Sequence, residues 1–121
     1  MVGSIFFVSD NSGVLKAKCI GFLNKGNGRV GDIGVYSILG SGKSKFLKRG
    51  KVVHGVILKI RHFIFRSTGH RVKFNLNGIV LCKLTDSRNV EPFSNRILVS
   101  VSYEVKLKGF LKIASISRNL I

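Results

Sequence analysis

The sequence predicts an all-β fold, a small closed or nearly closed antiparallel barrel from which a basic β-ribbon projects. Three observations predict it. Short runs rich in β-branched and aromatic residues recur at nearly regular spacing, clusters of Gly, Asn, Asp and Ser separate them, and a 3.6-residue apolar period is not evident before the C-terminal part. A chain of 121 residues fits one domain, so we expect a single domain over residues 1–121.

The expected strands follow one another along the chain, and each is bounded by turn-forming residues. They are SIFFVS (4–9), VLKAKCIGFL (14–23), DIGVYSIL (32–39), VVHGVILKIRHFIF (52–65), HRVKFNL (70–76) and GIVLCKL (78–84). The turns between them are DNSG (10–13), NKGNGRVGD (24–32), GSGKS (40–44), STG (67–69), NLNG (75–78) and TDSRN (85–89).

The ribbon is predicted over residues 59–74, where two arms carrying Arg and Lys flank a short turn at Thr68–Gly69. We expect the barrel, with this ribbon, to occupy about residues 1–90 and a C-terminal segment to occupy about 91–121. In SYEVKLKGFLKIASIS (102–117), periodicity does not separate one or two short helices from a final strand, because the run is short and Gly109 interrupts it.

The charge of the chain points to a polyanionic partner. Lys and Arg number 21 against 5 Asp and Glu, which gives a net charge of +16 and a pI near 10.7. No acidic residue occurs between Ile33 and Thr85, and a cationic field of this density repels itself unless an anion neutralises it. Nucleic acid is the favoured partner. An anionic membrane surface is second, because the cations follow a strand period rather than a helical one, and no apolar run approaches the roughly 18 residues of a membrane span.

The loop GSGKS (40–44) resembles part of a phosphate-binding loop, but the rest of that motif is absent. Such a loop has a glycine five positions before its final glycine, and Ser37 stands there. The following residues, KFLKRGKVVHG, do not predict the helix that a nucleotide phosphate needs. We expect a cationic turn between strands, and nucleotide hydrolysis is the weakest of the functions considered.

No catalytic set is evident, so we do not expect an enzyme. The five acidic residues are scattered, and Asp10, Asp32 and Asp86 occupy turn positions where Asp bonds its own backbone. Cys19 and Cys82 lie in apolar runs, which predicts buried free thiols. The three histidines have Lys and Arg as neighbours, which repel a metal cation, so neither a metal nor a cofactor is expected.

Six motifs, in order and at fitting distances, resemble those of the large-subunit ribosomal protein L-fourteen family. They are VSDNSG (8–13), GDI (31–33), KRGKV (48–52), FNLNGIVL (74–81), NRI (95–97) and FLKI (110–113). The chain departs from the family in two places. The ribbon is several residues shorter than usual, and Leu98-Val99-Ser100 replaces the glycine and proline of the family turn, so we expect the backbone geometry there to differ.

The resemblance implies one ribosomal-protein domain, built as a five-stranded barrel with a projecting ribbon and short C-terminal helices. It implies a structural constituent of the large ribosomal subunit that binds large-subunit rRNA near the subunit interface and contributes to an intersubunit bridge. The implied partners are small-subunit rRNA across the interface, neighbouring proteins of the L-three and L-nineteen families, and the ribosome-silencing factor.

Residue choice predicts the compartment. Ala and Pro are scarce while Phe, Ile, Lys, Asn and Ser are plentiful, as an A/T-rich coding sequence gives. The N-terminus has neither a basic stretch nor a cleavage site of a targeting peptide. We therefore expect a divergent organellar protein of the mitochondrial large ribosomal subunit, with a plastid or a bacterial cytoplasm as the alternative.

The residues expected to bind rRNA are basic residues in the middle of the chain together with one arginine near the end. A guanidinium engages phosphate through two hydrogen bonds or stacks on a base, which favours the arginines. The set is Lys43, Lys45, Lys48, Arg49, Lys51, Arg61, Arg66, His70, Arg71, Lys73 and Arg96. Phe63, Phe65 and Phe74 lie among them and either pack in the core or stack on bases. The alternative function is therefore a free-standing, OB-like module that binds single-stranded nucleic acid.

Overall fold

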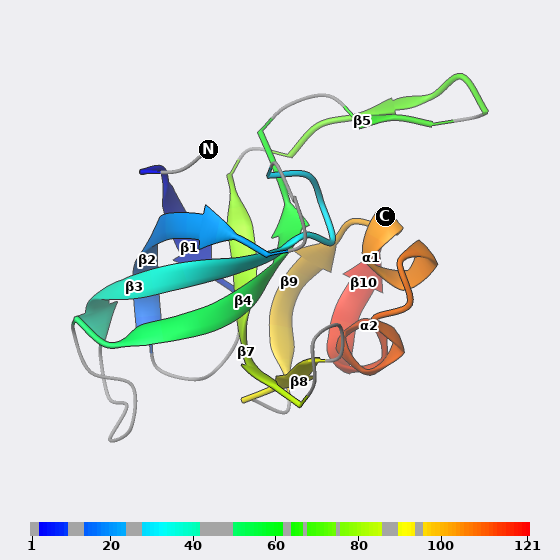
Figure 1. Ribbon diagram of the computed structural model, residues 1–121. Helices are drawn as coiled ribbons and strands as arrows, with labels where there is room; N and C mark the ends of the chain where they lie inside the picture. The colour runs from blue at the N-terminus through cyan, green and yellow to red at the C-terminus, as the bar shows by residue number, and fades with distance from the viewer. Residues whose placement is uncertain are drawn as a thin grey trace.

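The structure is a computed structural model, and it describes residues 3–9, 14–23, 28–41, 50–61, 64–66, 68–74, 76–85, 90–93 and 96–121. Figure 1 shows a barrel from which a long ribbon projects, with the C-terminal elements packed against the barrel. The elements are β1 (Ile5–Val8), β2 (Val14–Phe22), β3 (Ile33–Ser41), β4 (Val52–Lys59), β5 (Ile64–Phe65), β6 (Arg71–Val72), β7 (Gly78–Leu84), β8 (Val90–Pro92), β9 (Ile97–Val101), α1 (Glu104–Leu107), α2 (Leu111–Ile116) and β10 (Ser117–Leu120).

The strands β1, β2, β3, β4 and β7 form a closed five-stranded barrel, which confirms the predicted fold class. They are hydrogen-bonded in this order, and β1 pairs with β7 to complete the circle. The successive pairs are antiparallel, whereas the closing pair is parallel, with Phe7 opposite Gly78 and Val8 opposite Ile79. A closed ring with an odd number of strands cannot be antiparallel throughout, so five strands require one parallel pair.

The barrel interior is filled by alternate residues of its strands. Phe6, Ala17 and Ile38 face inward at matching register positions and are fully buried. Tyr36 is buried beside them, and its ring meets that of Phe6 edge to face with 5.5 Å between the ring centroids. Gly55, on β4, leaves room for the Tyr36 ring: a β-carbon there would lie 3.2 Å from it.

The outer face of β4 and β7 is also buried, because the C-terminal segment covers it. Val56 and Val80 are register partners on this face, and both are fully buried. The backbone N–H of Ser102 donates to the carbonyl of Leu58 at 3.1 Å, which joins the end of β9 to β4. Figure 1 shows β9, β10 and the two helices on this side of the barrel.

The C-terminal segment contains both of the structures that the sequence left open, two short helices and a final strand. β10 pairs with β9 in parallel, since α1 and α2 carry the chain back between them. The inward residues Val101, Val105 and Ile113 belong to the same buried cluster as the barrel core. The strands β8 and β9 were not among the predicted elements.

The ribbon consists of β5 and β6, with Ile64 opposite Val72. The expected strand 52–65 is interrupted after Lys59, where the backbone N–H of Arg61 donates to the side-chain oxygen of Asn77 at 2.9 Å. At the tip, the N–H of Gly69 donates to the carbonyl of Arg66 at 3.0 Å, which closes the predicted turn.

Both cysteines are buried free thiols, as predicted. Burial raises the pKa of the Cys19 thiol, so it stays protonated at neutral pH. In the part of the chain that the structure describes, no helix is long and apolar enough to cross a membrane.

Candidate nucleic-acid interface

The structure describes seven of the eleven basic residues that were predicted to bind rRNA. Lys51, Arg61, His70, Arg71, Lys73 and Arg96 are exposed, and Arg66 is half-buried. The other four, Lys43, Lys45, Lys48 and Arg49, lie outside the described residues, as do the last three residues of GSGKS. Gly40 and Ser41, the first two residues of that loop, end β3 rather than belonging to a turn.

The ribbon and its base carry five of the seven described residues on one projecting element. Arg61 lies two residues after the end of β4, and Arg71 begins β6, the second strand of the ribbon. His70 directly precedes β6 and Lys73 directly follows it. The base is closed by a hydrogen bond from the N–H of Phe74 to the carbonyl of Ile60 at 3.2 Å. The exposed cations are therefore carried on a hydrogen-bonded hairpin, which fixes their spacing.

Two of the predicted residues lie away from the ribbon. Lys51 immediately precedes β4, and this eight-residue strand separates it from the ribbon base by about 26 Å. Arg96 precedes β9, whose other end meets β4 through Ser102. The seven described residues thus lie near both ends of β4, along the ribbon and before β9, and they do not form one compact patch.

Arg66 has partners within the chain, which sequence reasoning missed. Its guanidinium donates from Nε to Oε1 of Glu104 at 2.9 Å and from Nη2 to Oε2 at 3.2 Å. Nη2 also donates to the backbone oxygen of Ile121 at 2.5 Å. The hydroxyl of Ser102 donates to the same carboxylate. These contacts fasten the ribbon tip to the C-terminal segment.

The pKa shifts of Glu104 and Arg66 both favour the charged forms that make the ion pair. Burial of Glu104 by itself raises the pKa of its carboxyl, but the hydrogen bonds from Arg66 and Ser102 outweigh that effect and hold the pKa below its ordinary value. The hydrogen bond to Glu104 in turn raises the pKa of the Arg66 guanidinium. Both side chains are therefore charged at neutral pH.

Asp32 organises the turn before β3, as predicted. Its Oδ2 accepts hydrogen bonds from the backbone N–H groups of Gly28 at 3.1 Å and Arg29 at 2.8 Å. Its Oδ1 lies 3.4 Å from Nζ of Lys108. The stem of Lys108 crosses Gly31, which has a φ of 86° and carries no β-carbon to block it. The predicted turn positions of Asp10 and Asp86 lie outside the described residues.

The described carboxylates are all engaged with cations. Glu104 pairs with Arg66, Asp32 with Lys108, and Glu91 with Lys112 at 2.7 Å. The exposed cations Lys16, Lys18, Arg61 and Arg96 have no acidic partner among the residues described. These four charges are available to an external anion.

Two of these cations, Lys16 and Lys18, were not among the predicted site residues. Both lie on the outer face of β2, with Ala17 pointing inward between them. The signal that could have found them is the K-x-K spacing of LKAKC, since a period of two places both side chains on one face of a strand. Of the three aromatic candidates, Phe74 is half-buried, while Phe63 and the side chain of Phe65 lie outside the described part.

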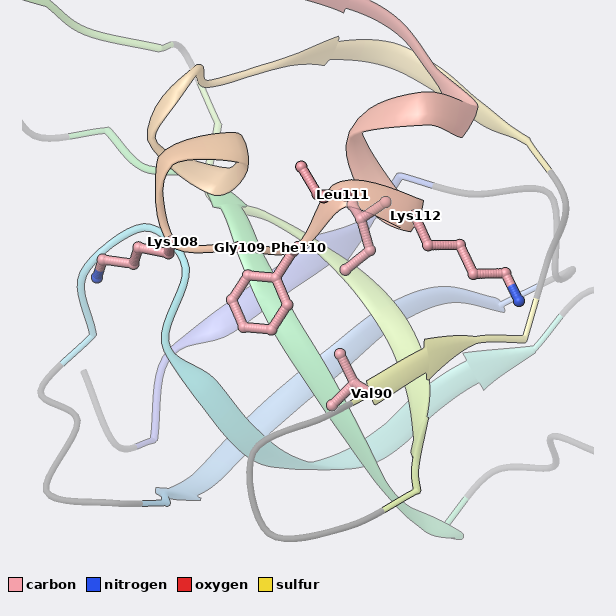
Figure 2. Close-up of a pocket in the computed structure, with 7 residues that line it drawn as sticks. Val90, Lys108, Gly109, Phe110, Leu111 and Lys112 are labelled. Atoms are coloured by element: carbon pink, nitrogen blue, oxygen red, sulfur yellow. The ribbon is translucent and has the colours of Figure 1, made fainter.

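A pocket of about 350 Å³ lies between β8 and the connection of the two helices. Figure 2 shows the Phe110 ring pointing toward Val90, with the chains of Lys108 and Lys112 extending in opposite directions. Both lysines are already paired, with Asp32 and Glu91 respectively. Among the described residues, no group of three or more His, Cys, Asp or Glu side chains is placed to hold a metal ion.

Comparison with known proteins finds a matching family and a relative of nearly equal length. The model of the family described as ribosomal protein L14p/L23e matches residues 1–121. A large ribosomal subunit protein uL14 from Petrotoga mobilis (strain DSM 10674 / SJ95) is 36% identical over 116 residues, which cover 93% of this chain and 92% of that protein. A match over the whole chain and a relative of nearly equal length confirm the resemblance that the six motifs indicated. This chain belongs to the ribosomal protein L14p/L23e family, a family of structural proteins rather than enzymes.

Proposed function

We propose that this chain is a structural constituent of the large ribosomal subunit, that it binds large-subunit rRNA near the subunit interface, and that it contributes to an intersubunit bridge. The observation that carries the proposal is the exposed ribbon. Its basic residues Arg61, His70, Arg71 and Lys73 are exposed on a hairpin that extends from the barrel (Figure 1).

Binding rests mainly on neutralising phosphates and releasing the counterions condensed on RNA. The major groove of A-form RNA is too narrow for side chains to read, so selectivity comes from the shape of the folded rRNA and from 2′-hydroxyl contacts. A pre-formed ribbon suits this mode of recognition. Because Arg66 and Glu104 anchor its tip, little conformational freedom is left for the ribbon to lose when it binds.

The remaining expectations extend this proposal to specific partners. The neighbours are proteins of the L-three and L-nineteen families, small-subunit rRNA across the interface, and the ribosome-silencing factor. The proposed location is the mitochondrial large subunit, with a plastid or a bacterial cytoplasm as the alternative. The genomic location of the coding sequence tests this choice directly, and a gene on a bacterial chromosome would exclude the mitochondrion.

Salt dependence of binding tests the proposed mechanism. For the full chain and large-subunit rRNA, a plot of log K against log salt should have a slope near −5 if about six phosphates are contacted. Replacing Arg71 and Lys73 together by Ala should make the slope shallower by about 2, since each phosphate contact contributes about 0.9. Lys112→Ala is the matched control, because Lys112 pairs with Glu91, and it should leave the slope unchanged. An unchanged slope in the double variant would remove the ribbon from the proposed interface.

Sedimentation of cell extracts tests the assignment to the ribosome. On the proposed function the chain migrates with large subunits through moderate salt. A free-standing single-strand binder, the alternative, would remain in the light fractions instead. That result would overturn the proposal whatever the salt slope of the purified chain.

A further inference from the structure

A partly buried lysine lies where the barrel closes. Lys59 is the last residue of β4, and its register partner is Gly78, the first residue of β7. Gly78 is in turn opposite Phe7 of β1, and the backbone N–H of Ser9, just after β1, donates to the carbonyl of Ile79 at 2.9 Å. Lys59 therefore belongs to the framework that joins β4, β7 and β1.

The stem of Lys59 lies over Gly78, which has no side chain of its own. A β-carbon on Gly78 would lie 2.8 Å from Cε of Lys59, 3.0 Å from its Cγ and 2.8 Å from Oγ of Ser9. The lysine stem and the serine hydroxyl therefore share the space that the glycine leaves open. Ser9 is buried and Lys59 is half-buried, so the lysine is partly withdrawn from water but a small solute can still reach it.

The amine of Lys59 has no anion beside it in the part of the chain that the structure describes. The carboxylates there pair with Arg66, Lys108 and Lys112. The groups packed against the lysine, Ser9 and Gly78, carry no charge.

The surroundings of Lys59 make its amine more reactive. Burial lowers the pKa of the Lys59 amine, and no neighbouring charge contributes to that shift. Near pH 8, a larger share of this amine is therefore neutral than in an exposed lysine with the ordinary pKa of 10.5. The neutral amine is the form that attacks a carbonyl carbon, and a partly buried lysine without a counter-ion is a common nucleophile in proteins.

We propose that Lys59 is a modification site, at which the activated acyl group of a small acyl phosphate is transferred to the amine more readily than to the exposed lysines. Nζ attacks the carbonyl carbon of the donor, and an N–C bond forms as the bond from that carbon to the phosphate oxygen breaks. Phosphate leaves with the electron pair of the broken bond, and water takes the proton that the nitrogen loses. The product is a neutral amide in place of a partly desolvated ammonium.

This inference goes beyond the proposed function and does not rest on it. Only its consequence for rRNA does, since acylation removes one positive charge two residues before Arg61, at the base of the ribbon. Failure of rRNA binding would leave the acylation of Lys59 unaffected, so the two proposals fail separately.

Acetyl phosphate, added to the folded full chain at pH 8, tests the proposal. Mass spectrometry of the peptides gives the acetylated fraction of each lysine over time. The initial rate at Lys59 should be at least about threefold higher than at Lys18, an exposed lysine on β2. In guanidinium chloride the two rates should be equal, because the contacts over Gly78 are lost.

The pH dependence gives a readout that access alone would not change. The ratio of the rate at Lys59 to the rate at Lys18 should be largest near pH 8 and fall toward pH 10.5, where an ordinary lysine also becomes neutral. A ratio that is the same at every pH would overturn the proposal, because the preference would not come from the neutral amine.

A variant tests the contact that encloses the lysine. Gly78→Ala puts a β-carbon 2.8 Å from Cε of Lys59, which pushes the side chain into water and should bring the rate ratio to about one. Gly21→Ala, with open space around it, is the matched control and should leave the ratio unchanged. Equal melting temperatures would show that both variants fold.

Two further results would overturn the proposal. One is an equal initial rate at Lys59 and Lys18 in the folded chain, and the other is a preference for Lys59 that persists in guanidinium chloride. Both comparisons use the unmodified sequence, so they decide the question even if Gly78→Ala fails to fold.

Discussion

The ion pair between Arg66 and Glu104 offers the sharpest test of how the ribbon is held. Glu104→Gln keeps the shape of the side chain but removes the charge that two guanidinium hydrogen bonds use. Hydrogen bonds to charged groups contribute about 1.5–3 kcal/mol each, whereas exposed ion pairs contribute about 0.2–1 kcal/mol. The two side chains are 26% and 20% exposed, so solvent screens part of the interaction. We expect the variant to lower the free energy of unfolding by about 1–2 kcal/mol at pH 7.

The effect should depend on pH in a definite direction. The pKa of Glu104 is lower in the folded chain than the ordinary value of 4.5. A group with a depressed folded pKa stabilises the fold above its unfolded pKa and loses this contribution as the pH falls through its folded pKa. The difference between wild type and variant should therefore be constant from pH 7 to about pH 5 and shrink below pH 4.5.

Urea unfolding followed by circular dichroism measures this difference at each pH. For a chain of 121 residues, 1 kcal/mol corresponds to a shift of about 4 °C in melting temperature, which gives an independent check. Glu91→Gln, which removes the exposed pair with Lys112, is the control and should leave the midpoint unchanged. A pH-independent difference for Glu104→Gln, or none at pH 7, would show that the carboxylate does not hold the ribbon through its charge.

Three further predictions concern packing. Gly55→Ala should lower the free energy of unfolding by about 2 kcal/mol, because the new β-carbon would lie 2.9 Å from a backbone oxygen of β7. Gly21→Ala, which has open space around it, is the control and should lower the free energy of unfolding far less. Chemical denaturation of the two variants measures the difference. Gly31→Ala and Gly50→Ala both place alanine at a φ of 86°, but only the first also displaces the side chain of Lys108, so its melting temperature should be the lower of the two. Both buried cysteine thiols should resist iodoacetamide in the native chain and react after denaturation, and rapid native alkylation would contradict their burial.

Much of the barrel could be predicted from the sequence because its strands and turns are specified by residues that lie close together in the chain. In β2 the residues that point inward are apolar, and Lys16 and Lys18 occupy outward positions, so alternation revealed the strand. Asp32 and Gly31 marked the turn before β3 by side-chain chemistry and backbone freedom alone. The ribbon turn at Thr68–Gly69 was recognisable for the same reason.

The remaining features depend on contacts between residues far apart in the chain. The interruption after Lys59 involves the Asn77 side chain, and the pair of Arg66 with Glu104 spans 38 positions. No local pattern encodes either contact. The strand β10 is likewise stabilised by β9, from which two helices separate it. For this reason the C-terminal segment stayed ambiguous from the sequence.

The parallel pairing of β1 with β7 has a consequence for synthesis. The first strand must stay without its second neighbour until residues 78 and 79 have been made, so the nascent chain carries an open strand edge through most of its translation. Contacts of such large sequence separation also slow folding. Chaperones, or early capture of the cationic chain by a polyanion, would have their greatest effect during this interval.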